Sequence, residues 1–368
     1  MKRLRRGFRG RPVAMASLIV LAILYGGMIT AEFISPYRHT TVFRDHVYHP
    51  PNLIFHSPEL GFGPQIQERV LVDQLNWRYS RVRGRYHRVE LFVRGPEYRF
   101  FGLFRSNLHL FGVNAPYVPG GTTWEEGGRN VPVFVFGADH MGRDLFSRVW
   151  HGARISLTIG FVGITISLTL AIALGGLAGY YGGKFDWFVM RFAEFVILIP
   201  GLYLILFLRS VLSRDLDSGQ SFMLITVILS FVGWPGSARL IRGMVHAIKR
   251  EDFIAAAQLD GIPPLVIVFR QIIPQMASIL IVSITLGIPG FILGETVLSY
   301  LGLGIVDPAV SWGSLLNREI STLNNLRNFP WFLYPGLFLL LTTLAFNLIG
   351  DLLRDLFDPY YREKKIGS

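Results

Sequence analysis

The chain has 368 residues, contains no cysteine, and only 17% of its residues are charged. Without cysteine it cannot form disulfides, use a thiol nucleophile, or bind zinc or an iron–sulfur cluster through cysteine. A Walker A phosphate-binding loop is also missing, because GYYGGK at 179–184 lacks the spacing and the Lys-Ser/Thr ending. His140 and His151 are too far apart for an i, i+4 metal pair, so we predict no metal site. The sequence therefore excludes thiol enzymes and Walker A ATPases.

Apolar residues, in contrast, are abundant. They make up 51% of the chain, with a mean hydropathy of +0.40, whereas soluble domains contain roughly 45–50%. The net charge is +11, and the basic residues flank apolar runs rather than gathering on one polar domain. This distribution follows the positive-inside rule of membrane proteins, so we predict that the chain lies in lipid and binds no nucleic acid.

Six apolar runs predict the membrane topology. The first, 13–31, exceeds the about 7–15 residues of a signal-peptide core, so we interpret it as a retained span. Its preceding basic residues and the two lysines of the tail place both termini in the cytoplasm: Lys2, Arg3, Arg5, Arg6, Arg9, Arg11, Lys364 and Lys365. The other runs are 155–180, 187–208, 221–240, 276–293 and 331–349. The fold class is therefore an all-α polytopic membrane protein with six transmembrane helices.

Residues 36–136 differ from the rest, being rich in arginine, aromatic residues and proline, with no run long enough to span a membrane. Arg88–Val93 and Tyr98–Phe104 are short and rich in β-branched or aromatic residues, which predicts a small antiparallel sheet. We expect an extracytoplasmic β-rich insertion between the first two spans. Such an insertion could receive another protein, cover the outer ends of the spans, or only pack on the membrane domain, and the sequence leaves these alternatives open.

Some residues within the predicted spans have candidate roles. Gly175, Gly179 and Gly183 recur at a spacing that lets membrane helices touch backbone to backbone. Glu194 lies three residues from Arg191, and charges at membrane depth are expected to be paired or to face a path. Pairing with Arg191 is the simpler interpretation. Glu295 either faces the translocation path or holds helices together.

The loop 250–274 joins the fourth and fifth spans and predicts a docking surface. Its residues 253–260 favour a helix, and the acidic Glu251 and Asp252 suit the N-terminus of that helix. Gly261 then permits a C-terminal cap, and the prolines at 263 and 264 force a turn before a second helix at 265–273. Three small side chains allow another protein to approach closely: Ala255, Ala256 and Ala257.

The loop resembles the EAA loop of ABC-transporter permeases, the coupling helix that sits in a cleft of the ATPase subunit. Ala256, Ala257, Gly261 and Pro274 match that pattern, while Ala255 stands where a glutamate is usual. Three further stretches resemble motifs of oligopeptide, dipeptide and nickel permeases. They are GADHMGRDLFSRVWHGAR at 137–154, GETVLSYLGLG at 294–304, and the ending from 335 to 359. In the first of these, charges alternate in sign at near-helical spacing, which predicts an interfacial helix with ion pairs: Asp139, Arg143, Asp144 and Arg148.

This resemblance implies a permease subunit of an ATP-driven importer in the cell inner membrane, for peptides or a related small solute. It implies several partner subunits: a second permease, two ATPases and an extracytoplasmic substrate-binding protein. ATP and magnesium would bind the ATPases, with no cofactor in this chain. The residues implied in ATPase coupling are Asp252, Phe253, Ala255, Ala256, Ala257, Gly261 and Pro274. A membrane-anchored scaffold or envelope-assembly protein acting through its outer β domain is the alternative.

The predicted organisation has four parts. Residues 1–35 hold the basic N-terminus and the first span, and 36–136 form the insertion. Residues 137–359 form the permease core with five spans, and 360–368 form a cytoplasmic tail.

Overall fold

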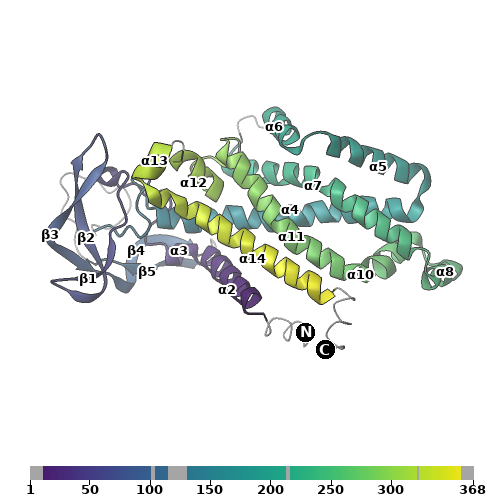
Figure 1. Cartoon of the computed structure of the whole chain (residues 1–368), viewed down its shortest axis with the longest axis horizontal. Helices are drawn as coiled ribbons and strands as arrows, with labels where there is room; N and C mark the ends of the chain where they lie inside the picture. Colours follow the sequence, from purple (N-terminus) through teal and green to yellow (C-terminus); the bar gives the residue numbers. More distant parts are fainter. Residues whose placement is uncertain (1–10, 101–103, 115–130, 213–215, 321–322, 358–368) are drawn as a thin grey trace. The chain divides into compact units, whose positions relative to one another are not determined.

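The structure, a computed structural model, describes residues 11–100, 104–114, 131–212, 216–320 and 323–357 (Figure 1). The basic residues predicted before Arg11 and the tail 360–368 lie outside the described residues. The chain divides into two compact units. The loop unit comprises the described residues of Met1–Leu21, Leu157–Val297 and Leu341–Ser368. The strand unit comprises those of Ala22–Ser156 and Leu298–Leu340.

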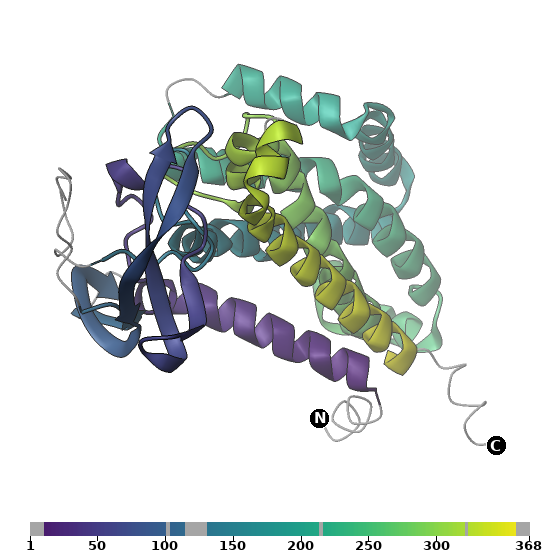
Figure 2. The same ribbon diagram turned by 60° about the vertical axis from the view of Figure 1, so that its left-hand side comes forward.

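The strand unit contains antiparallel strands in two sheets, visible in Figure 2. β1 (Leu53–Ser57), β2 (Gly61–Asp73) and β3 (Arg78–Arg88) form a three-stranded sheet in that order. β4 (Glu90–Phe100) pairs with β5 (Phe104–Gly112) in a separate hairpin. A small apolar core forms next to the strands from Ile66, Val113, Val131 and Val133. The β-rich insertion predicted from the sequence is therefore confirmed.

Both predicted strand segments are wrong in detail. Arg88 ends β3, whereas Val93 lies on β4. Residues 98 and 104 belong to different strands, because Tyr98 pairs with Ser106 and Phe100 pairs with Phe104. Tyr98 and Phe104 therefore lie on two neighbouring antiparallel strands. Aromatic composition identifies residues that suit a pleated surface, but it does not locate the turn between two such strands.

The helices longer than one turn are α2 (Pro12–Ile29), α4 (Leu145–Tyr181), α5 (Gly183–Leu198), α6 (Gly201–Leu212), α7 (Ser218–Ile248), α8 (Asp252–Leu259), α11 (Ala277–Tyr300), α12 (Trp312–Glu319), α13 (Leu323–Asn328) and α14 (Tyr334–Phe357). Shorter helical turns are α3 (Ala31–Ile34), η1 (Arg44–His46), α9 (Pro264–Val266), η2 (Ile267–Ile272), α10 (Ile273–Gln275) and η3 (Pro330–Leu333).

Among the described residues, five helical segments are long and apolar enough to cross a membrane. They are α2, α4, α7, α11 and the continuous η3–α14 segment. The span predicted at 187–208 is not one straight helix, since α5 and α6 meet at an angle of 92°. Pro200 explains the break, because Ile199 before it is extended, with ψ 124°, and proline disfavours a helical conformation at the preceding residue. The count rises to six if the bent pair is one span.

Two of the three glycines predicted to pack helices lie against α7. A Cβ atom added to Gly175 would lie 2.4 Å from the carbonyl oxygen of Ala238, and one added to Gly179 would lie 2.6 Å from that of Arg242. α4 and α7 therefore touch through their backbones. The prediction for Gly183 is wrong. Among the described residues, nothing beyond its chain neighbours lies within 4 Å of the place a Cβ would take, and it is the first residue of α5, with φ +59°.

Candidate functional site

α8 is the central element of the predicted docking loop. Its inner side carries Ile254 and Ala257, which are buried with Ile267 and Val268 in the core of the loop unit. Phe253, Ala255 and Ala256 are exposed on the rest of the helix. The prediction that all three alanines form one exposed surface is therefore corrected, because Ala257 is only 5% exposed. Successive helix residues point about 100° apart, so three in a row cannot share a narrow face.

The end of α8 has the cap predicted for it. Gly261 adopts φ +71°, its amide donates to the carbonyl of Gln258 at 3.1 Å, and the amide of Ile262 donates to the carbonyl of Ala257 at 3.1 Å. A glycine in the left-handed region closes a helix in this way without steric strain. The second helix differs from the prediction of a single segment at 265–273. It consists of α9, the π-helix η2 and α10, which contains Pro274.

Contacts with the end of α4 hold both α8 and the end of α7 in place. The side chain of Gln258 donates to the hydroxyl of Tyr180 at 3.2 Å, and the ammonium of Lys249 donates to the carbonyl of Tyr180. The same ammonium lies 5.1 Å from the centre of the Tyr180 ring. The sequence did not reveal Tyr180 as part of this site. Its only signal was its position in GYYGGK beside the packing glycines.

The two acidic residues at the start of α8 are both exposed. Glu251 is the N-cap residue but its side chain makes no capping hydrogen bond, and Asp252 lies in the first turn. Both precede Ala255 by three or four residues, which places them on the same side of the helix. A carboxylate is therefore present one turn before the position where a glutamate is usual.

The two glutamates considered for a path have different surroundings. Glu194 accepts a hydrogen bond from Arg191 at 2.6 Å, and its other oxygen lies 3.7 Å from Arg239 on α7. The simpler interpretation of Glu194, pairing with Arg191, agrees with this geometry. Glu295 is 0% exposed, so within this chain it lies in the packed interior of α11 and its neighbours.

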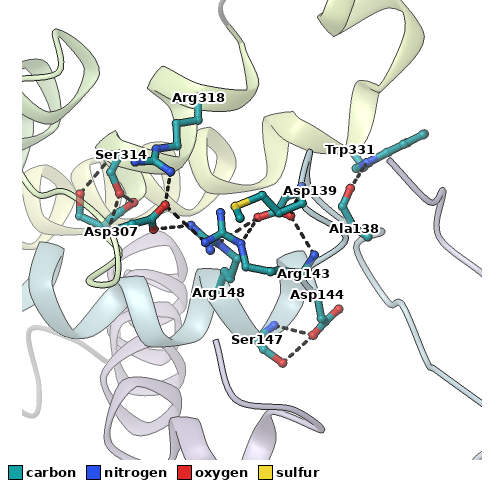
Figure 3. Close-up of polar contacts among 12 residues, drawn as sticks. Ala138, Asp139, Arg143, Asp144, Ser147, Arg148, Asp307, Ser314, Arg318 and Trp331 are labelled. Atoms are coloured by element: carbon teal, nitrogen blue, oxygen red, sulfur yellow. Dashed lines mark hydrogen bonds and ion pairs between the residues drawn. The ribbon is translucent and has the colours of Figure 1, made fainter. Parts of the chain in front are cut away.

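A second polar cluster lies in the strand unit, at the start of α4 (Figure 3). One oxygen of Asp139 accepts from Arg143 at 2.7 Å and lies 3.5 Å from Arg148. Asp307 pairs with both of these arginines at 3.3 and 3.4 Å, and also with Arg318. The cluster ties the segment before α4 to the segment between α11 and α12. We predicted ion pairs among these residues, and the structure contains them.

The predicted helix around these ion pairs is wrong in extent, because residues 138–144 form a turn and α4 begins at Leu145. Ala138 and Asp144 form an isolated antiparallel bridge, and the amide of Gly142, with φ +78°, donates to the carbonyl of Asp139 at 2.9 Å. The second oxygen of Asp139 accepts the amide of Arg143 at 2.8 Å. Asp139 therefore satisfies backbone donors and guanidinium groups together, which a helical arrangement would not allow.

Burial and neighbouring charges shift the pKa values of Asp144 and Asp307 in opposite directions. Burial raises the pKa of Asp144 to about 7, although the amide and hydroxyl of Ser147 both donate to one oxygen of that side chain. For Asp307, burial acts in the same direction, but the charges of Arg143, Arg148 and Arg318 outweigh it and lower the pKa. The pKa of Asp307 thus lies below its ordinary value, as suits an ion-pair partner, whereas that of Asp144 is raised.

Two family models match the chain. "Binding-protein-dependent transport system inner membrane component" covers residues 171–363, and "N-terminal TM domain of oligopeptide transport permease C" covers residues 1–51. Neither match includes residues 52–170, where the strands described above lie.

Curated relatives also match over about three-fifths of the chain. The oligopeptide transport system permease protein OppC of Haemophilus influenzae is 39% identical over 225 residues, or 61% of this chain and 70% of that protein. The dipeptide transport system permease protein DppC of Bacillus subtilis is 38% identical over 228 residues, or 62% and 69%. OppC of Escherichia coli is 39% identical over 225 residues, or 61% and 72%.

Proposed function

The chain belongs to the family of binding-protein-dependent transport system inner membrane components, and on this premise we propose that it is one permease subunit of an ATP-driven ABC importer for peptides or a related small solute. The observation that carries the proposal is the family match across residues 171–363, together with relatives that are oligopeptide and dipeptide permeases. The chain forms the translocation path with a second, homologous permease. A binding protein outside the membrane delivers the solute.

The proposal includes a topology of six spans, counting α5 and α6 as one broken span. Both termini and the α8 loop then lie in the cytoplasm, and the insertion lies outside. The basic residues before the first span and at the end of the chain support this orientation. The insertion is also basic, but long extracytoplasmic loops cross the membrane largely regardless of charge.

In this proposal the chain performs no covalent chemistry. Two ATPase subunits bind ATP and magnesium and hold α8 through its exposed residues, Phe253, Ala255 and Ala256, and through the carboxylate of Asp252. When the ATPases close, α8 moves with them. The bonds from Gln258 and Lys249 to Tyr180 pass this movement to α4 as a rigid-body shift of packed helices. ATP thereby biases the equilibrium between outward-open and inward-open states, since it binds them with different affinity.

The test is to replace Ala256 by tryptophan in the complete transporter. The complex is purified with its second permease and ATPases and placed in proteoliposomes with its binding protein. ATP hydrolysis and uptake of trialanine are then measured. We expect uptake to fall about tenfold or more, equivalent to roughly 1.4 kcal/mol of lost coupling, because a bulky side chain keeps the ATPase away from α8.

Ala16→Trp is the matched control, because Ala16 is also an exposed alanine on a helix but lies on α2, away from the loop. Wild-type uptake by Ala256→Trp would show that α8 is not the coupling element. If no ATPase co-purifies with the wild-type chain, the scaffold alternative is favoured instead.

A further inference from the structure

Two pairs of arginines face each other across the strands of the insertion. Arg69 on β2 is the direct cross-strand partner of Arg81 on β3, and Arg99 on β4 is the direct partner of Arg105 on β5. Direct cross-strand partners have Cβ atoms about 4.5–5.5 Å apart on the same face, and like charges in this position destabilise a sheet. Each of the two sheets carries this arrangement once, and so places positive charge where folding alone does not favour it.

The described residues do not neutralise these four arginines. The ion pairs found in the described strands join Glu68 to Arg85 and His87, and none of them includes a member of the arginine pairs. Burial together with the charge of Arg81 lowers the pKa of Arg69. From residue 53 to residue 112 the sequence has nine arginines, no lysine and five acidic residues, a net charge of 9 − 5 = +4. The insertion is therefore complementary to an acidic surface.

Three members of the pairs are accessible to a partner. Arg81, Arg99 and Arg105 are exposed, and Arg69 is half-buried. Phe104, next to Arg105 in sequence, is also exposed at the end of the hairpin. Arginine beside exposed aromatic residues is the composition of protein–protein interfaces, where these residue types supply much of the binding energy.

Exposed apolar residues lie toward both ends of β2. Phe62, 88% exposed, lies near its start, and Leu75, 93% exposed, lies just beyond its end, with Arg69 between them on the strand. Apolar and guanidinium groups together are typical of protein–protein interfaces, so the occupant we argue for is a protein.

We propose that the insertion is a docking surface for an acidic face of the solute-binding protein, contacted through two arginine pairs, Arg69–Arg81 on one sheet and Arg99–Arg105 on the other. The inference rests on the proposed function, because that function requires such a protein to visit the outer face of the permease. It assigns a role to a segment that neither family model covers.

The experiment uses the full transporter in nanodiscs and the binding protein that stimulates ATP hydrolysis of the wild-type complex. Binding is measured by surface plasmon resonance at 50 and 500 mM salt for two double variants, Arg99→Gln with Arg105→Gln and Arg69→Gln with Arg81→Gln. We expect each to weaken binding about tenfold at low salt, mainly through a slower association rate, and much less at high salt. Arg-to-Lys substitutions at the same sites should restore most of the binding.

Arg85→Gln is the matched control, since Arg85 is an exposed strand arginine that already has a carboxylate partner in Glu68. It should change the affinity less than about twofold. Melting temperatures provide a second readout. Neutralising a like-charge pair should leave the melting temperature unchanged or raise it, whereas a purely structural role for the arginines predicts a lower one.

Wild-type affinity in both double variants overturns the docking surface while leaving the importer function intact. A lower melting temperature with unchanged affinity also overturns it, in favour of a structural role. Hydrogen exchange in nanodiscs with and without phosphatidylglycerol tests the lipid alternative. If this lipid protects β4–β5 in the wild type, and the variants lose that protection while they bind the binding protein normally, the partner is lipid and the proposal is wrong. Failure of the importer proposal is distinguishable, because then no binding protein stimulates ATP hydrolysis of the wild-type complex.

Discussion

Arg143 and Arg148 at the start of α4 are buried, and both have carboxylate oxygens of Asp139 and Asp307 within 3.5 Å. Arg99 and Arg105 in the β4–β5 hairpin are exposed and face each other instead. Both groups lie in the strand unit. A buried guanidinium must be matched within the chain, because an uncompensated charge in the interior is costly. An exposed one can remain unmatched until a partner supplies the opposite charge.

The largest expected effect comes from removing a carboxylate partner of the buried arginines. Asp139→Ala removes the carboxylate shared by Arg143 and Arg148 and also an acceptor of two backbone amides. We expect a loss of about 3–5 kcal/mol in the free energy of unfolding, since two guanidinium groups lose a buried partner. The measurement is the melting temperature and yield of the complex in mild detergent. Unchanged values would mean that the buried arginines do not need Asp139.

Asp144 tests whether the same region responds to pH. Burial raises its pKa in the folded chain to about 7, above its ordinary 3.8, so the folded state holds this proton at pH values where the unfolded state has released it. The associated stability is present at low pH and is lost as pH rises through about 4 to 7. We expect the wild type to lose about 2–4 kcal/mol of stability from this group between pH 4 and pH 8.

Asp144→Asn should remove this dependence, because the asparagine side chain can still accept the amide of Ser147 but cannot ionise. Melting temperatures of both proteins across this pH range provide the measurement. Parallel pH profiles for wild type and variant would contradict the assignment to Asp144.

Close and loose packing can be compared in the same way within the loop unit, at two neighbouring glycines of α4. Gly175→Ala forces a methyl group against the backbone of α7, where the carbonyl oxygen of Ala238 would lie 2.4 Å away. We expect a cost of about 1–3 kcal/mol, seen as a lower melting temperature and less assembled complex. Gly176→Ala is the matched control, since its nearest neighbours would lie at 3.7 and 3.8 Å. It should be neutral or stabilise α4 by up to about 1 kcal/mol through helix propensity. Equal effects of the two substitutions would contradict the backbone contact.

The smallest effect is expected at the exposed ion pair of the insertion. Glu68→Gln removes the partner of Arg85 and His87, yet Arg85 is largely exposed. A surface ion pair contributes about 0–1 kcal/mol, so the melting temperature should change by little. A loss comparable to that of Asp139→Ala would remove the distinction between the buried and exposed arginines.

The sequence alone predicted the apolar runs, the β-rich insertion and the cap of α8, because these depend on local composition and on single residues such as Gly261. Four motif resemblances predicted the family that the comparisons then showed. Some properties depend only on residues that are neighbours in the sequence, such as the hydropathy of a segment or a glycine shortly before two prolines. These can be predicted without knowing which distant residues are in contact.

Only the tertiary structure decided how these elements are used. It bent the third predicted span at Pro200, buried Ala257 while leaving Ala256 exposed, and put Gly183 at the first position of α5 rather than in a helix contact. It also joined Asp139 to Asp307 through two arginines and set the arginines of the strands opposite each other. Each of these outcomes depends on which distant residues become neighbours, because burial, ion pairing and strand register are properties of packed pairs and not of single positions.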